Sequence, residues 1–302
     1  MSKPKPPTVQ DFFKRFPTDH ACLDHLMELR FGKRRTCSKC GKDSTFHKRA
    51  KRPAYECANC GYDINPMVGT PFERTRTPLQ KWFYAIYLFT TTRHGVPAKE
   101  LQRQLSVTYK TAWRMGHELR KYMAYVDGDS SLGGPTGGVV EIDETRIGGK
   151  DVKGKDDKTV VMGMLERQGE LITRVVPNVR RKTLYRYILA HVRKGSRVAT
   201  DELGSYKTLR FKGYRHASVA HRRDEYVRGE VHVNSIEGFW SLLQRSIRGT
   251  HVHVSAKHLP KYVGEFEYRH NLRDAPHLMF EFLVMAFPRP ARKRVTVANN
   301  KI

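Results

Sequence analysis

Two Cys-x-x-Cys pairs constrain the fold of this chain more than any other feature of its sequence. Cys37 and Cys40 form the first pair, and Cys57 and Cys60 form the second. Four thiolates at this spacing can surround one zinc ion tetrahedrally, and a module this small needs the metal in order to fold. A glycine directly follows the second cysteine of each pair, where a turn needs a permissive backbone. The sequence therefore predicts a zinc ribbon with these four cysteines as ligands of a structural zinc ion.

The charge of the chain is the second constraint. Its 302 residues include 56 lysines and arginines against 30 acidic residues, a formal net charge of +26. A charge of this size opposes compaction unless a polyanion neutralises it, so we expect nucleic acid as the partner. Cysteines paired for metal are typical of a reducing compartment. The sequence has neither a long apolar run nor a signal-peptide core, so we expect a cytoplasmic protein that does not enter a membrane.

Residues 95–122 have the pattern of two short amphipathic helices joined by a tight turn. We expect helices over residues 97–104 and 108–123, with Leu101, Leu119 and Trp113 in their shared core. This pattern predicts a helix-turn-helix, although an ordinary helical hairpin would look similar. The second helix would present these side chains to phosphates and base edges: Thr108, Tyr109, Lys110, Arg114, His117 and Arg120.

The composition of the chain changes at residues 127–138, which are rich in glycine and serine and predict a linker. Before it we expect an N-terminal helix and zinc ribbon over residues 1–70 and the helix-turn-helix domain over 71–126. The strands expected after it are 139–149, 158–166, 170–177, 196–202 and 216–221, with a helix over 181–193 and further helices from Asn234 onward. This order predicts an α/β domain with a mixed sheet over residues 139–288, followed by a basic tail over 289–302.

Acidic side chains occur at three points of the expected α/β domain. Asp143 lies within an apolar strand, on the same face as Glu141, where a carboxylate costs free energy unless a cation compensates it. Asp201 ends another apolar strand, and Asn234 and Glu237 lie one turn apart at the start of a helix. Carboxylates from two strands and a helix can converge on two magnesium ions. Such ions activate a water or a 3′-hydroxyl and stabilise the leaving oxygen during attack on phosphorus.

Residues 20–285 resemble the zinc-ribbon-bearing (ISXO-like) group of bacterial insertion-sequence transposases, in the DDE superfamily. The stretches that carry the resemblance include CSKCG…CANCG, TYKTAWRMGHELR, VVEIDETRIGGK, TDELGSY and HVNSIEGFWSLLQRSIRG. The resemblance implies a ribonuclease-H-like catalytic fold. It also implies magnesium-dependent cleavage at transposon ends and transfer of the freed 3′-hydroxyl into target DNA. By position, it implies Asp143 and Asp201 as the first two magnesium ligands. It implies Glu237 as the third, with Asn234 as the alternative. We also expect Tyr206 to line the site.

One position departs from the resemblance. The group commonly carries a lysine, thought to contact DNA, one or two turns after the third ligand, and this chain has Gln244 there. Arg245 or Arg248 could replace that lysine as a phosphate contact.

Together these features favour a transposase that binds double-stranded DNA, both the terminal inverted repeats and the target. Paired transposon ends require at least two active sites, so we expect a homodimer or larger homo-oligomer that associates with the bacterial nucleoid. Two alternatives remain open. One is a zinc-ribbon and helix-turn-helix DNA-binding regulator without catalytic activity, which Gln244 would favour. The other is a ribonuclease-H-fold nuclease that cuts without joining.

Overall fold

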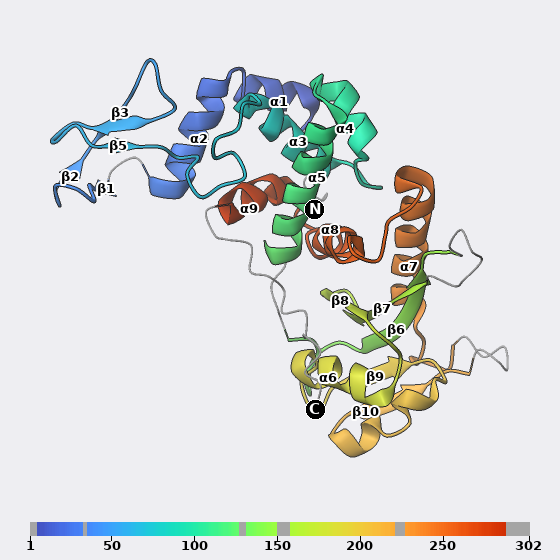
Figure 1. The fold of residues 1–302 in the computed structure, drawn as a ribbon. Helices are drawn as coiled ribbons and strands as arrows, with labels where there is room; N and C mark the ends of the chain where they lie inside the picture. The colour runs from blue at the N-terminus through green and yellow to red at the C-terminus, as the bar shows by residue number, and fades with distance from the viewer. Residues whose placement is uncertain (1–4, 33–34, 127–130, 150–157, 221–226, 288–302) are drawn as a thin grey trace, which may run out of the picture. The chain divides into compact units, whose positions relative to one another are not determined.

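A computed structural model describes residues 5–32, 35–126, 131–149, 158–220 and 227–287 of the chain (Figure 1). The predicted basic tail over 289–302 lies outside the described residues. The chain divides into two compact units. The first comprises Met1–Thr92, Ala98–Val126 and Asp274–Ile302, and the second comprises Arg93–Pro97 and Asp127–Arg273. In chain order, the second unit is therefore inserted between parts of the first.

The first unit is mainly helical. Its helices are α1 (Val9–Arg15), α2 (Asp19–Phe31), α3 (Leu79–Thr91), α4 (Ala98–Leu105), α5 (Tyr109–Val126) and α9 (Met279–Ala286). Helix α3 buries Trp82, Phe83 and Phe89 completely. A helix that is apolar on most of its circumference is stable only within a core, so α3 forms the centre of this unit.

Helix α9 packs in the first unit although it is the last helix in the described chain. The ring of Phe280 stacks on Phe16 with centroids 5.4 Å apart, and Phe287 lies edge-on to Phe72 at 5.0 Å. The predicted boundary at residue 288 is therefore corrected, because the second unit ends at Arg273. The apolar sequence of α9 predicts burial, but it does not specify which core the helix joins.

The cysteine-rich segment between α2 and α3 forms short strands. These are β1 (Arg35–Thr36), β2 (Asp43–Ser44), β3 (Phe46–Lys48), β4 (Tyr55–Cys57) and β5 (Asp63–Ile64). β1 and β2 form one antiparallel pair, and β3, β4 and β5 form an antiparallel sheet with β4 in the centre. Strands of two or three residues have few ladder bonds, so this segment depends on the cysteines for its stability.

A five-stranded mixed sheet forms the centre of the second unit. Its strands are β6 (Val140–Ile147), β7 (Thr159–Glu166), β8 (Leu171–Val176), β9 (Arg197–Thr200) and β10 (Arg215–Ser218). Their order across the sheet is β10-β9-β6-β7-β8. Strand β7 runs antiparallel to β6 and β8, whereas β9 runs parallel to β6 and β10. The five strands and the mixed sheet predicted from the sequence are confirmed.

Helices cover both faces of this sheet (Figure 1). On one face, α6 (Arg181–His191) packs Leu184 and Ile188 against Ile142 of β6. On the other face, α7 (Asn234–Ser246) and α8 (Leu259–Asn271) pack Trp240 and Phe266 against β7 and β8. The alternation of a β-strand thus directs even-numbered residues of β6 toward α6 and odd-numbered residues toward α7.

Most of the glycine-rich segment predicted as a linker is bound to the second unit. Leu132 is 1% exposed and forms a β-bridge with Val192. The backbone N–H groups of Gly133 and Gly138 donate to the Glu166 carboxylate at 2.8 and 2.9 Å. Residues 127–130 lie outside the described chain, so the linker prediction is corrected from residue 131 onward. Its glycine amides are bonded within the domain instead of being solvated.

Candidate active site and zinc-binding site

The two cysteine pairs have the same backbone geometry. In each, the N–H of the first cysteine donates to a carbonyl five residues later, Cys37 to Lys42 and Cys57 to Tyr62, both at 2.9 Å. The glycine after the second cysteine has a φ of 68° in the first pair and 70° in the second. A left-handed φ suits glycine, which explains the residue at both turns.

The four cysteine sulfurs lie within 4.8 Å of one another. Among the described residues, they are the only group of three or more His, Cys, Asp or Glu ligand atoms held this closely. The Ser44 hydroxyl lies 3.2 Å from Cys57 Sγ, and this contact is the main reason that the pKa of the Cys57 thiol falls to about 6. Backbone N–H groups, first that of Cys40, lower the pKa of Cys37 as well. Zinc binds the thiolate form, so this set of donors fits a zinc ion.

Asp143 is placed on the face of β6 that turns toward α7. Its Oδ2 accepts a hydrogen bond of 3.1 Å from Trp240 Nε1. Burial raises the pKa of Asp143 to about 6, and the negative charges of Asp201 and Glu237 add to the effect of burial. The structure thus places Asp201 and Glu237 near enough to Asp143 for their charges to act on its carboxylate.

Asp201 reaches this site because β9 runs parallel to β6. Ile142 pairs with Thr200 in the register, so the residue after β9 lies beside the middle of β6. Asp201 Oδ1 accepts a 3.0 Å hydrogen bond from the backbone N–H of Leu203, which orients the carboxylate at the start of the following loop. Glu237 is half-buried in the first turn of α7, whereas Asn234 is exposed at the first residue of that helix.

Glu144 is a fourth acidic residue near the site, and the sequence reading assigned it no role. It lies on the opposite face of β6, where Tyr206 Oη donates a short hydrogen bond to Glu144 Oε1. Burial, with smaller contributions from the charges of Asp143 and Asp201, raises the pKa of Glu144 to about 8. Tyr206 is 1% exposed. This tyrosine therefore contacts an acidic neighbour of the candidate site, and the Asp-Glu pair within an apolar strand was the sequence signal for Glu144.

The residues that follow Glu237 on α7 divide between the core and the surface. Phe239, Trp240 and Leu243 are buried. Gln244, at the position where a lysine was expected, donates from Nε2 to Thr145 Oγ1 of β6 at 2.7 Å. Its amide therefore binds the sheet. The predicted phosphate contacts Arg245 and Arg248 are exposed.

Helices α4 and α5 form at the positions predicted for the helix-turn-helix, but three side chains differ from expectation. Arg120, predicted to contact DNA, is 2% exposed, and its guanidinium lies 4.9 Å from the ring centroid of Phe89. A Cβ at Gly116 would lie 2.9 Å from Arg120 Nη1, so the arginine occupies space that this glycine leaves open. The prediction of a DNA contact for Arg120 is therefore corrected.

The other two side chains exchange their predicted environments. His117 was expected at the surface but is 4% exposed, while Trp113 was expected in the core but is 39% exposed. The two rings lie one turn apart with centroids separated by 3.8 Å, so the indole covers the imidazole. Lys110 and Arg114 are exposed, as predicted. No helix among the described residues is both long enough and apolar enough to cross a membrane.

Comparisons with known proteins agree with this geometry. Residues 135–271 match the family described as the ISXO2-like transposase domain, and residues 17–63 match the transposase zinc-ribbon domain. The two matches thus indicate a transposase zinc ribbon followed by a DDE-type transposase domain. The chain is similar to the zinc-ribbon-bearing, ISXO2-like transposases over both of these segments, which confirms the resemblance seen in its sequence. The domain match implies a ribonuclease-H-like fold for the second unit.

A full-length relative has a similar extent. The "Uncharacterized protein in transposable element ISH50" of Halobacterium salinarum is 28% identical over 288 residues, which is 87% of this chain and 94% of that protein. The similarity therefore extends over both units.

Proposed function

We propose that this chain is a transposase that cleaves DNA at transposon ends and joins the freed 3′-hydroxyl to target DNA, with magnesium as the catalytic metal. The convergence of Asp143, Asp201 and Glu237 carries this proposal. The three carboxylates come from two adjacent parallel strands and the helix that faces them, and the charges of the other two act on Asp143.

The donor set fits magnesium. Carboxylate oxygens are the ligands that magnesium prefers. Two magnesium ions about 3.5–4 Å apart would need ligand atoms that are spaced farther apart than those around one zinc ion. When bound, the metal would activate the attacking oxygen and stabilise the leaving oxygen. Glu237 is proposed as the third ligand in preference to Asn234, because an anionic oxygen binds magnesium more strongly than an amide. Trp240 orients the Asp143 carboxylate through its indole N–H.

Exposed basic side chains in both units would hold the DNA. We propose that α4 and α5 act as a helix-turn-helix in which Lys110 and Arg114 contact DNA, since both are exposed near the start of α5. In the second unit, Arg245 is exposed in the last turn of α7 and Arg248 is exposed in the π-helical turn Ile247–His251 that follows it. Arg248 lines a cavity of about 190 Å³ together with Arg146. The net charge of +26 supports binding along an extended polyanion. Paired ends would require a homodimer or larger assembly.

The test is a strand-transfer assay with the full chain, magnesium, a labelled duplex carrying the end of the element, and plasmid DNA as target. Asp201→Asn should abolish both nicking and joining. Glu230→Gln is the matched control, because Glu230 is a carboxylate of the same unit whose side chain is 81% exposed, and it should leave both reactions intact.

Three other outcomes would contradict parts of the proposal. Tight end-specific binding without cleavage would favour the DNA-binding regulator. Cleavage without joining would favour the nuclease. Joining that survives Asp201→Asn would remove Asp201 from the proposed ligands.

A further inference from the structure

We infer that Glu141 is a positioning residue for the proposed metal site: it anchors the start of α7 to β6 and thereby sets where Glu237 lies relative to Asp143. The inference rests on the proposed function, because it concerns the same three carboxylates. Glu141 lies on β6 two residues before Asp143, on the same face of the strand, and its side chain is fully buried.

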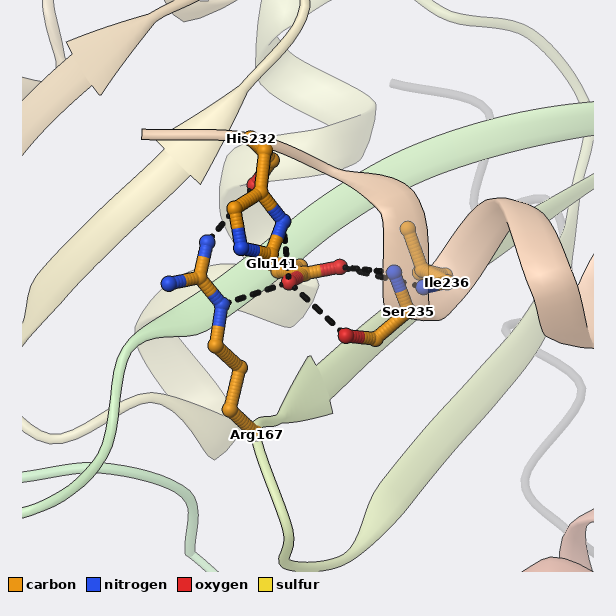
Figure 2. A network of polar contacts seen from close by, with 5 residues as sticks. All are labelled: Glu141, Arg167, His232, Ser235 and Ile236. Carbon is orange, nitrogen blue, oxygen red and sulfur yellow. Dashed lines mark hydrogen bonds and ion pairs between the residues drawn. The ribbon is translucent and has the colours of Figure 1, made fainter. Parts of the chain in front are cut away.

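The Glu141 carboxylate accepts hydrogen bonds from the first turn of α7 (Figure 2). Its Oε2 accepts from the backbone N–H of Ser235 at 2.9 Å and from that of Ile236 at 3.0 Å, and its Oε1 accepts from Ser235 Oγ at 3.0 Å. The first N–H groups of a helix have no partner within the helix, and no side chain of the residue before α7 caps them. A strand residue therefore provides the cap.

Two further groups complete the network and draw in the segment that leads into α7. Arg167 Nε donates to Glu141 Oε1 at 2.6 Å, and Arg167 Nη2 donates to the backbone carbonyl of His232 at 3.0 Å. His232 Nδ1 lies 3.3 Å from the same Oε1. Figure 2 shows Arg167 Nε, the His232 ring and the first turn of α7 directed at the one carboxylate. The arginine and the positive end of the helix dipole compensate the buried negative charge.

This bonding excludes Glu141 itself as a metal ligand. A carboxylate has about four lone-pair sites, and four N–H or O–H groups already donate to this one. The residue that follows Ser235 and Ile236 is Glu237, the proposed third ligand. A single strand thus carries Asp143 and, two residues away, the group that fixes the helix turn bearing Glu237.

The test compares Mn²⁺ binding by the full-length, zinc-loaded chain without DNA, measured by calorimetry, for the parent and for Glu141→Gln. Glutamine replaces one acceptor oxygen by an NH₂ group, which then faces other donors. We expect the Kd for Mn²⁺ to rise by about 10- to 100-fold, the usual effect of losing a group that orients metal ligands. The magnesium concentration that gives half-maximal end cleavage should rise in parallel.

Glu267→Gln is the matched control for a purely structural role. Glu267 is also a fully buried carboxylate of the second unit, and it accepts a 2.9 Å hydrogen bond from the Thr173 backbone N–H, joining α8 to β8. Its replacement should lower the melting temperature without changing Mn²⁺ affinity. Ser235→Ala removes only one hydroxyl donor from an exposed residue, so it should fold normally and raise the Kd to a smaller extent.

The outcomes separate this inference from the proposed function. If Asp143→Asn weakens Mn²⁺ binding but Glu141→Gln and Ser235→Ala do not, the positioning role is wrong and the metal site stands. If Glu141→Gln does not fold, Ser235→Ala decides the question, and an unchanged Mn²⁺ affinity in that variant would also show that the positioning role is wrong. If Asp143→Asn leaves Mn²⁺ binding unchanged, the proposed metal site fails, and this inference fails with it.

Discussion

Replacing Gly163 by alanine should push α7 away from the sheet. Gly163 on β7 pairs with Asp143 on β6, and an added Cβ would lie 2.7 Å from Trp240 Cζ2 and 2.8 Å from Ile236 Cδ1. Carbon atoms in a packed interior settle about 3.5–4.0 Å apart, so the indole or the whole helix must retreat by roughly 1 Å. The same indole donates to Asp143, so the retreat would disturb the proposed metal site directly.

The size of the effect follows from two opposing contributions. Overpacking a closed core costs about 1–3 kcal/mol, and the smaller conformational freedom of alanine in the unfolded chain offsets about 0.4–1 kcal/mol of that cost. We therefore expect Gly163→Ala to lower the free energy of unfolding by about 1–2 kcal/mol. In a domain of this size class, that corresponds to a fall in melting temperature of roughly 2–8 °C. The magnesium requirement for end cleavage should rise by about 10-fold.

Differential scanning calorimetry of the full chain measures the first effect, and a magnesium titration of cleavage measures the second. Gly238→Ala is the matched control: Gly238 is exposed on α7, a Cβ there would meet nothing within 4 Å, and alanine should stabilise the helix by up to about 1 kcal/mol. If Gly163→Ala melted at the parent temperature with an unchanged magnesium requirement, α7 would not press on the sheet at this point, and the packing argument would fail.

Two other predictions concern charge. Burial and the charges of Asp201 and Glu237 raise the pKa of Asp143 from its ordinary value of 3.8 to about 6, so the ionised form opposes folding of the metal-free chain. This destabilisation is absent below pH 3.8, grows between the two pKa values and is complete above pH 6. Asp143→Asn should therefore stabilise the metal-free protein at pH 8 by about 1–3 kcal/mol and have little effect on its stability near pH 4. A lower melting temperature for this variant at pH 8 would contradict the argument. For DNA binding, Arg114→Ala should reduce the slope of log affinity against log salt by about one, whereas Arg120→Ala should leave the slope unchanged and lower the melting temperature. Equal slopes for the two variants would show that Arg114 does not contact phosphate.

The parts of the fold that depend on local pattern could be predicted from the sequence. The spacing of the cysteine pairs predicts the ribbon, and the alternation in VVEIDETRI predicts both the strand β6 and the face on which Glu141 and Asp143 lie. The surroundings of α5 could not be predicted in this way. The burial of Arg120 depends on space beside Gly116, and a helical pattern does not reveal a space that is created in three dimensions. The attachment of α9 to the first unit was missed for a similar reason, because any apolar core could accept its sequence.

The candidate site follows the same division. Asp143 and Asp201 could be singled out because acidic residues are unusual in or directly after apolar strands, and Glu237 because it lies one turn into a helix. The partners of Glu141 and Glu144 could not be predicted. Strand alternation specifies the face of a side chain, but the donor that it meets depends on how α7 and the loop after β9 pack on the sheet.

The insertion of the second unit into the first has a consequence for the synthesis of the protein. Helix α9 and the residue after it supply Phe280 and Phe287 to the aromatic core of the first unit, and they leave the ribosome only after the whole of the second unit has been made. A nascent chain therefore holds its N-terminal helices with an incomplete core until α9 has been translated. A message truncated anywhere before residue 279 would lack this helix altogether. Shortened copies of the gene would therefore not give a stable free-standing N-terminal unit.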